Sequence, residues 1–142
     1  MSERIFPRPQ DAEAAFYEAL EHADLEAMMA VWAEDEEIVC VHPTGARLAG
    51  PADVRASWER MFTGGGGVRV EITQKVEVTG MMIAVHSVHE NFSVPGDARP
   101  TAPIIATNVY VRGAAGWRMV VHHASPAPGP AEPRTEHPKI LH

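Results

Sequence analysis

The chain has 142 residues, of which 45% are hydrophobic and 22% are charged, and its 12 Lys and Arg against 19 Asp and Glu give a net charge of −7. This length and composition fit one globular domain and exclude an intrinsically disordered chain. An acidic chain without a basic cluster binds nucleic acid and anionic membranes poorly, so neither is expected as a partner.

Three further features narrow the class of protein. The longest apolar runs, at 81–85 and 109–111, are far shorter than the roughly 18 residues that a membrane helix needs. Residues 1–10 carry charges and prolines and have no apolar segment of the signal-peptide kind. The single cysteine, Cys40, excludes an internal disulfide. We therefore expect a soluble, cytoplasmic protein.

Helical periodicity predicts three helices in the first half of the chain. Asp11 is a suitable N-cap for the first, in which apolar residues recur at helical spacing as far as Leu20. Asp24 is the expected N-cap of the second, and the short break between the two predicts a helical hairpin. The third helix is expected to begin at Pro51 and to end at the glycine run 64–67.

Strand patterns dominate the second half. Between 68 and 79, apolar residues alternate with polar ones and only Gln74 is outside the pattern, which predicts a long strand with one apolar face. Other strands are expected at 38–42, 81–92, 104–111 and 117–123. We take residues 1–10 as an N-terminal arm, 11–125 as the domain, and the proline-rich segment 126–142 as an extended or disordered tail.

This order of elements predicts an α+β fold. Strands joined by short turns form a curved antiparallel sheet, and the N-terminal helices cover one of its faces. A sheet wrapped around helices in this way forms a cone, and the mouth of the cone is a suitable place for a ligand pocket.

Segments spread from Asp11 to Ser125 carry a family resemblance. They are the hairpin AFYEALEHADLEAMMAVWAED, the turn VHPTG, the helix GPADVRASWERMF and the strands ATNVYVR and GWRMVVHHASP. In order and spacing they resemble the nuclear transport factor 2-like superfamily, and within it the SnoaL-like and ketosteroid-isomerase-like proteins. The resemblance implies the cone-shaped fold, commonly dimerised through the sheet. It covers isomerases, aldol cyclases, dehydratases and members without known activity, so the fold alone does not choose a function.

His42 is the first candidate catalytic residue. It follows a strand and precedes Pro43, where the resemblance to the steroid isomerases places their general-base aspartate. An imidazole with a pKa near 6.5 suits proton abstraction at neutral pH. The alternative is a packed histidine with a structural role.

Asn108 is the second candidate, because an amide inside a buried strand needs a partner. The resemblance places a proton-donating acid here, and the amide of Asn108 would hold an enolate oxygen in its place. The alternative is that Asn108 only ties the sheet to a loop. The family's oxyanion tyrosine aligns with Phe16, which cannot donate, and Tyr17 is about 100° further around the helix and is expected to face elsewhere. Genuine steroid isomerase activity is therefore not expected.

Adjacent histidines at 122 and 123 suggest a third catalytic group. Consecutive strand residues face opposite sides of a sheet, so either His122 or His123 faces the cavity, and the sequence leaves open which. A metal site built from His42, one of this pair and Glu90 is conceivable from the residue types. None of the usual local ligand spacings is present, so no metal and no other cofactor is expected.

Aromatic and methionine side chains at helical spacing are expected either to line the pocket or to fill the core. The ligand-binding candidates are Phe16, Tyr17, Met28, Trp32, Trp58, Met61, Glu90 and Ser125.

The favoured function is a small-molecule pocket protein for an apolar cyclic ligand. As an enzyme it would be a cofactor-independent isomerase, cyclase or dehydratase in which His42 takes a proton next to a carbonyl. Asn108 and one of His122 and His123 would stabilise the oxyanion. The alternative is a non-catalytic ligand-binding or accessory module of the same fold. A homodimer through the sheet is expected in either case.

Overall fold

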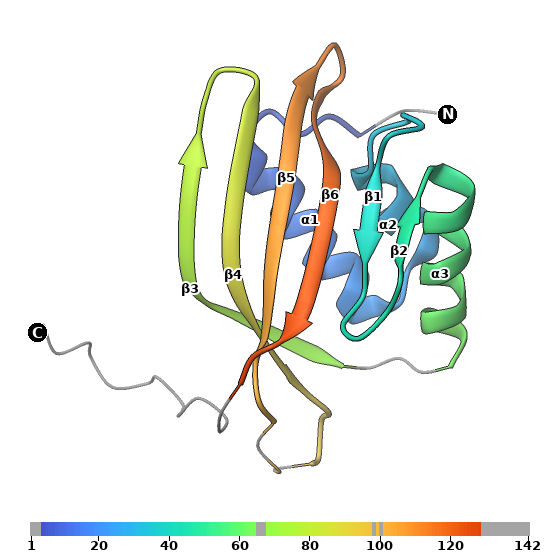
Figure 1. The fold of residues 1–142 in the computed structure, drawn as a ribbon, viewed down its shortest axis with the longest axis vertical. Coiled ribbons are helices and arrows are strands. Elements are labelled where there is room, and N and C mark those ends of the chain that lie inside the picture. The colour runs from blue at the N-terminus through green and yellow to red at the C-terminus, as the bar shows by residue number, and fades with distance from the viewer. Residues whose placement is uncertain (1–3, 65–67, 98, 100, 129–142) are drawn as a thin grey trace, which may run out of the picture.

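The computed structural model describes residues 4–64, 68–97, 99 and 101–128, and within these residues it has three helices and one six-stranded sheet. The α+β prediction is confirmed (Figure 1). The elements are α1 (Pro9–His22), α2 (Leu25–Val31), β1 (Val39–Val41), β2 (Arg47–Ala49), α3 (Pro51–Thr63), β3 (Arg69–Thr79), β4 (Ile83–Ser93), β5 (Ile104–Gly113) and β6 (Gly116–Pro126).

The helical hairpin forms as predicted, although α1 begins before the expected N-cap. Arg8 precedes the helix, and Asp11 lies inside its first turn, where it accepts hydrogen bonds from the backbone and guanidinium of Arg8. Ala23 ends α1 in the left-handed conformation with a φ of 51°. Asp24 then caps α2 by accepting a 3.0 Å hydrogen bond from the backbone of Ala27.

The sheet has the strand order β2–β1–β6–β5–β4–β3. Neighbouring strands pair antiparallel, except that β1 runs parallel to β6. Strand β2 was not predicted, because three residues are too few to show an alternating pattern, and it pairs with β1 at one edge. β3 forms the opposite edge.

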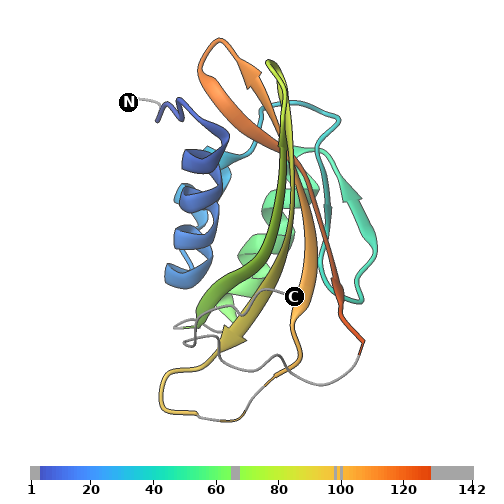
Figure 2. The same cartoon turned by 90° about the vertical axis from the view of Figure 1, so that its left-hand side faces the viewer.

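The helices lie on one side of the curved sheet, as Figure 2 shows for α1 and α3. α1 contacts β3, β5 and β6, and α3 contacts β2 and α2. None of the helices in the described ranges combines the length and the apolarity that crossing a bilayer requires. The largest fully buried apolar side chains are Trp32, Trp58, Tyr110, Phe16, Met28, Ile38, Met119, Val31, Val54 and Val88.

Both predicted terminal segments contribute residues to the fold. Phe6 is buried, and its carbonyl accepts a 2.8 Å hydrogen bond from the backbone of Trp117. At the other end, β6 extends to Pro126, and the backbone of Ala127 bonds to the carbonyl of Pro103. Residues 129–142 of the predicted tail lie outside the described part of the chain.

A β-bulge divides β3 into two halves of opposite parity. The register against β4 shifts around Gln74, whose φ is 53°. Ile72 packs against the core before the bulge, and after it Glu77 pairs with an inward residue of β4. Val76 and Val78 are consequently 63% and 66% exposed. The prediction of one continuous apolar face is therefore wrong, because the extra residue at a bulge reverses the alternation.

A second irregularity decides which of the paired histidines faces the helices. β6 carries one extra residue, Val120, between Met119 and Val121, whose partners on β5 are adjacent. After it, His122 lies on the inner face and is 3% exposed, whereas His123 is exposed on the outer face. His122, and not His123, is therefore the histidine of the pair that faces the interior.

Candidate functional site

Polar side chains stand in register across the inner face of the sheet. Glu77, His86, Asn108, His122 and Cys40 occupy successively paired positions on β3, β4, β5, β6 and β1. All of them except Glu77 are at most 3% exposed. Buried polar groups need partners, and the helices that cover this face supply several of them.

A chain of hydrogen bonds links this row to α1. The Tyr17 hydroxyl donates to Oε2 of Glu90 at 2.5 Å and accepts from Nδ2 of Asn108 at 2.9 Å. Oδ1 of Asn108 lies 2.6 Å from Nδ1 of His122. Because an amide oxygen only accepts, Nδ1 of His122 carries the proton. The chain Glu90–Tyr17–Asn108–His122 therefore has one consistent direction of donation.

Burial sets the protonation of these groups. It raises the pKa of Glu90 to about 7, against the lowering effect of the hydrogen bond from Tyr17. Burial is also the main reason that the pKa of the Tyr17 phenol lies far above its ordinary value, so Tyr17 remains a donor. Burial lowers the pKa of His122 to about 3, so this imidazole is neutral at physiological pH.

His42 lies just beyond β1 and is held by α3. Its Nε2 lies 3.0 Å from Oγ of Ser57, and the Ser57 hydroxyl donates to the carbonyl of Val54 at 2.8 Å. Since the single hydroxyl proton is used there, Nε2 of His42 donates and Nδ1 keeps its lone pair. Burial, and then the charge of Arg60, lower the pKa of His42, so the ring is a neutral base at pH 7.

Aromatic side chains form a wall beside both His42 and His122. Trp58 contacts both histidines, with ring centroids 4.6 Å from His42 and 6.0 Å from His122. Phe16 lies 4.9 Å from His122 and 5.6 Å from Trp58 by the same measure, and Phe62 extends the wall along α3 at 5.6 Å from Trp58. Phe16 therefore packs as part of this wall. Its ring has no hydroxyl with which to donate a hydrogen bond.

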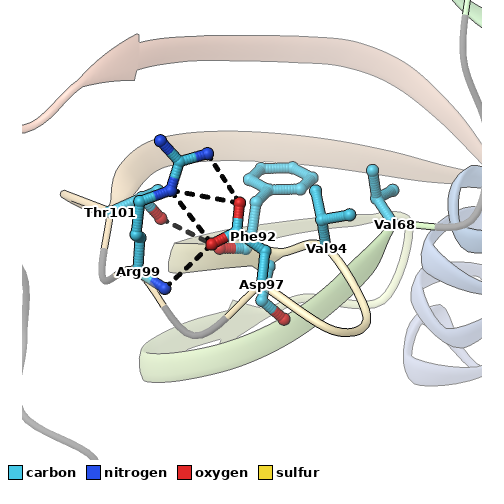
Figure 3. Close-up of a pocket in the computed structure, with 7 residues that line it drawn as sticks. Val68, Phe92, Val94, Asp97, Arg99 and Thr101 are labelled. Atoms are coloured by element: carbon cyan, nitrogen blue, oxygen red, sulfur yellow. Dashed lines mark hydrogen bonds and ion pairs between the residues drawn. The ribbon is translucent and has the colours of Figure 1, made fainter.

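A pocket of about 420 Å³ lies between the start of β3, the end of β4 and the following loop (Figure 3). In Figure 3 the apolar side chains of Phe92, Val94 and Val68 lie toward one end, and the ion pair between Asp97 and Arg99 lies toward the other. Its volume is in the range of small-ligand sites. Phe92 shares the inner face of β4 with Glu90, two residues earlier, whereas Glu90 itself does not line this pocket.

The structure corrects the expected direction of Tyr17. It lies in the interior, 7% exposed, and not away from it. The concave sheet surrounds α1 so widely that residues 100° apart on the helix are both buried. Tyr17 therefore supplies the hydroxyl that Phe16 lacks.

Several other candidates are not at this site. Met28 and Trp32 are fully enclosed in the core beside α2, and Met61 is 42% exposed on α3. His123 and Ser125 are exposed on the outer face of β6 and cannot contact an interior ligand. The combination of His42, His122 and Glu90 is not among the described groups with metal-binding geometry.

Ser57 and Glu13 are interior polar residues that were not among the predicted site residues. Glu13 is only 4% exposed on α1, one turn before Tyr17. An acidic residue four positions from a buried tyrosine lies on the same helix face, and this spacing was the available signal. For Ser57 the neighbouring Trp58 was recognised, but the preceding residue gave no pattern of its own.

The SnoaL-like domain family matches residues 10–129. A solved structure from Thiobacillus denitrificans ATCC 25259, provisionally named as a calcium/calmodulin-dependent protein kinase type II association domain, is 44% identical with a TM-score of 0.84. That match covers 89% of this chain and 100% of that chain. A provisionally named dehydratase of the NTF2-like family from Streptomyces avermitilis is 28% identical with a TM-score of 0.74, over 83% of this chain and 92% of that chain.

A plant protein is a more distant relative. The F-box protein SKIP8 of Arabidopsis thaliana is 26% identical over 111 residues, which are 78% of this chain and 46% of the plant protein. The chain thus spans about half the length of that relative. Since the family match extends over α1 to β6, this chain belongs to the SnoaL-like domain family and has an NTF2-like fold.

Proposed function

We propose that this chain binds a small apolar ligand with a carbonyl group and moves a proton next to that carbonyl, with His42 as base and Glu90 as acid. The supporting observation is that the two environments shift acidity in opposite directions. Burial raises the pKa of the Glu90 carboxyl to about 7, whereas burial and then the charge of Arg60 lower the pKa of the His42 imidazole from its ordinary value. Two groups whose environments push their pKa values apart in this way are suited to acid and base roles.

Each group has a defined task in this proposal. Nδ1 of His42 takes the proton from the carbon next to the carbonyl, while Ser57 and Trp58 hold the ring. When Glu90 is protonated, its carboxyl donates to the Tyr17 oxygen in place of accepting from it, which frees the single Tyr17 proton for the developing enolate oxygen. Asn108 keeps the Tyr17 oxygen in place through its amide nitrogen.

The reaction is balanced without an electron donor or acceptor. One C–H bond breaks, its electron pair forms the enolate, and the proton goes to His42. Return of that proton to a different carbon completes an isomerisation. In a dehydration, the acid protonates a leaving hydroxyl, which departs as water. The provisional naming of a 28% identical relative as a dehydratase is in keeping with this second outcome.

The proposal is tested by hydrogen exchange on cyclic ketones, which needs no knowledge of the natural substrate. In D₂O, proton NMR follows the loss of the hydrogens next to the carbonyl with wild type, His42→Ala and Glu90→Gln. The matched control is His123→Ala, which removes an exposed histidine from the outer face. We expect acceleration by wild type and the control, and a loss of about 100-fold in His42→Ala, as is typical for removal of a general base.

Two results would contradict the proposal. One is that His42→Ala accelerates exchange as well as wild type while circular dichroism shows an intact fold. The other is the absence of acceleration by wild type together with no saturable binding of a planar phenol such as 2-naphthol, which mimics the enolate.

A second candidate function is self-association through the outer face of the sheet. Valines occupy successively paired positions across this face: Val78, Val85, Val109, Val121 and Val39. In Figure 1 this face of β3 to β6 is toward the viewer and α1 lies behind it. A relative that is 44% identical carries the words association domain in its provisional name. We propose that a second copy of this chain covers the valine row, whether or not the interior is catalytic.

A further inference from the structure

Buried polar side chains gather at one place in the interior that the proposed reaction does not use. Nε2 of His86 and the hydroxyl of Tyr110 lack a hydrogen-bond partner among the described residues, and the centroids of the two rings are 5.1 Å apart. Nδ1 of His86 and Oε2 of Glu13 contact each other at 3.2 Å without hydrogen-bond geometry. Buried polar atoms are costly when unsatisfied, so their concentration here points to a bound group.

Three potential metal ligands converge here from three different elements. Glu13 on α1, Glu77 on β3 and His86 on β4 each place one ligand atom within 4.8 Å of the other two. Nδ1 of His86 lies 3.2 Å from Oε2 of Glu13, and Nε2 lies 3.9 Å from Oε2 of Glu77. His86 is completely buried, and Glu77 is placed on the inner face by the bulge at Gln74.

We propose that Glu13, Glu77 and His86 form a binding site for a divalent first-row metal ion such as Zn²⁺. One imidazole and two carboxylates are a suitable ligand set for such an ion. Metal–ligand distances of about 2.0–2.2 Å place tetrahedral ligands about 3.4 Å apart, so small side-chain movements suffice. The fourth position is then open to water.

Lys75 supplies the positive charge at this place in the absence of metal. Its Nζ lies 2.9 Å from Oε1 of Glu13 and 3.4 Å from Oε2 of Glu77. A divalent ion bound by both carboxylates would balance their two charges without Lys75. The Lys75 side chain is 39% exposed and flexible enough to turn toward solvent. Lys75 therefore competes with the metal for the same two carboxylates.

The contacts of Glu13 are consistent with a ligand role. Both of its carboxylate oxygens face this place, Oε1 toward Nζ of Lys75 and Oε2 toward Nδ1 of His86. An alternative reading of the cluster is a purely structural ion-pair network, and the experiment separates the two.

Calorimetric titration of the chelator-treated full chain with ZnCl₂ tests the site. We expect saturable binding of one ion to wild type, at least about tenfold weaker binding in His86→Gln and Glu77→Gln, and tighter binding in Lys75→Met. His123→Gln and Glu71→Gln are matched controls, because they change an exposed histidine and another exposed glutamate of β3. Visible absorption of the Co²⁺-loaded protein, altered by His86→Gln, would show that the imidazole is a direct ligand.

The result that overturns the proposal is wild-type binding that neither His86→Gln nor Glu77→Gln weakens, since the ion then binds elsewhere. Absence of saturable binding to wild type overturns it as well, and leaves a structural network. Should His86→Gln fail to fold, Glu77→Gln still decides, because the Glu77 side chain is 28% exposed and its loss leaves the core intact.

Discussion

The hydroxyl of Tyr17 on α1 donates a 2.5 Å hydrogen bond to Glu90 on β4, a residue 73 positions away in the sequence. This contact joins the first helix to the inner face of the sheet at the point where the carboxyl has a pKa of about 7. Its partners are buried, so the strength of the contact depends little on salt. The hydrogen bond between Tyr17 and Glu90 thus has two roles. It links α1 to the sheet, and it lies at the centre of the proposed proton transfer.

Replacing Tyr17 with phenylalanine should both destabilise the protein and raise the pKa of Glu90. The change removes the donor to Glu90 and the acceptor of Asn108. Loss of buried hydrogen bonds that leaves partners unsatisfied costs about 1–3 kcal/mol. Because the Tyr17 hydrogen bond acts to lower the pKa of Glu90, carboxyl carbon-13 NMR should show titration above pH 7 in the variant.

Tyr110→Phe is the matched control for that substitution. The Tyr110 hydroxyl is buried but has no hydrogen-bond partner among the described residues. Its removal should therefore cost little and leave the Glu90 titration unchanged. Equal destabilisation by the two substitutions in urea unfolding would show that the Tyr17 contact contributes no specific stability.

Glu90→Gln should change how stability depends on pH. In the folded protein the pKa of Glu90 is about 7, against an ordinary value of 4.5, so the folded state binds more protons between these pH values. The free energy of unfolding of wild type must then fall as pH rises through this window, in total by about 3 kcal/mol. The variant lacks this loss, and its stability relative to wild type should increase from pH 4.5 to 7.

His122 contributes a pH dependence of stability with the opposite sign. Comparing Glu90→Gln with wild type cancels this contribution, because both proteins contain His122. Its pKa is lowered to about 3, so the unfolded state binds more protons than the folded state between about 3 and 6.5. Stability therefore rises with pH over that range in both proteins, and the difference between them isolates Glu90. A difference that stays constant from pH 4.5 to 7 in chemical denaturation would contradict the raised pKa.

Val109→Lys should prevent self-association without disturbing the interior. Val109 lies at the centre of the valine row, half-buried on the outer face of β5. A charge there opposes burial against a second copy, so sedimentation should show a monomer under conditions in which we expect wild type to form a dimer. Ala14→Lys, on the exposed side of α1, is the control and should remain dimeric. A monomeric wild type at high protein concentration would refute the proposed assembly.

Gly116→Ala should be strongly destabilising, since two effects act on the same residue. Its φ of 93° is unfavourable for any side chain, and an added Cβ would lie 2.7 Å from the carbonyl oxygen of Phe6. Gly96 has a similar φ of 86° with no atom within 4 Å of the added carbon. Gly96→Ala thus measures backbone strain alone, about 1–2 kcal/mol, and thermal unfolding should show a clearly larger loss for Gly116→Ala.

Local patterns in the sequence predict the secondary structure of this chain well. The helix start at Pro51 and the cap at Asp24 are each determined within a few residues, so they could be read directly. Gln74 was visible as a break in the pattern, but its effect on Val76 and Val78 was not, because a bulge and a single polar substitution look alike in sequence.

The candidate site could be predicted only in part, because its contacts join distant segments. His42, Asn108 and Glu90 were identified by residue type and resemblance. The inward direction of Tyr17 depends on how widely the sheet wraps around α1, and that of His122 depends on an extra residue in β6. The meeting of Glu13 with His86 arises from tertiary packing and has no spacing in the chain that signals it.

The parallel pairing of β1 with β6 has a consequence for how the chain is made. Val39 lies opposite Val121, so β1, which His42 follows directly, obtains its parallel neighbour only once β6, the last described strand, exists. Contacts between such distant residues slow folding, and chains emerge from the ribosome with the N-terminal end first. Nascent β1 and β2 can pair with each other early, but they join the rest of the sheet only when β6 has been made.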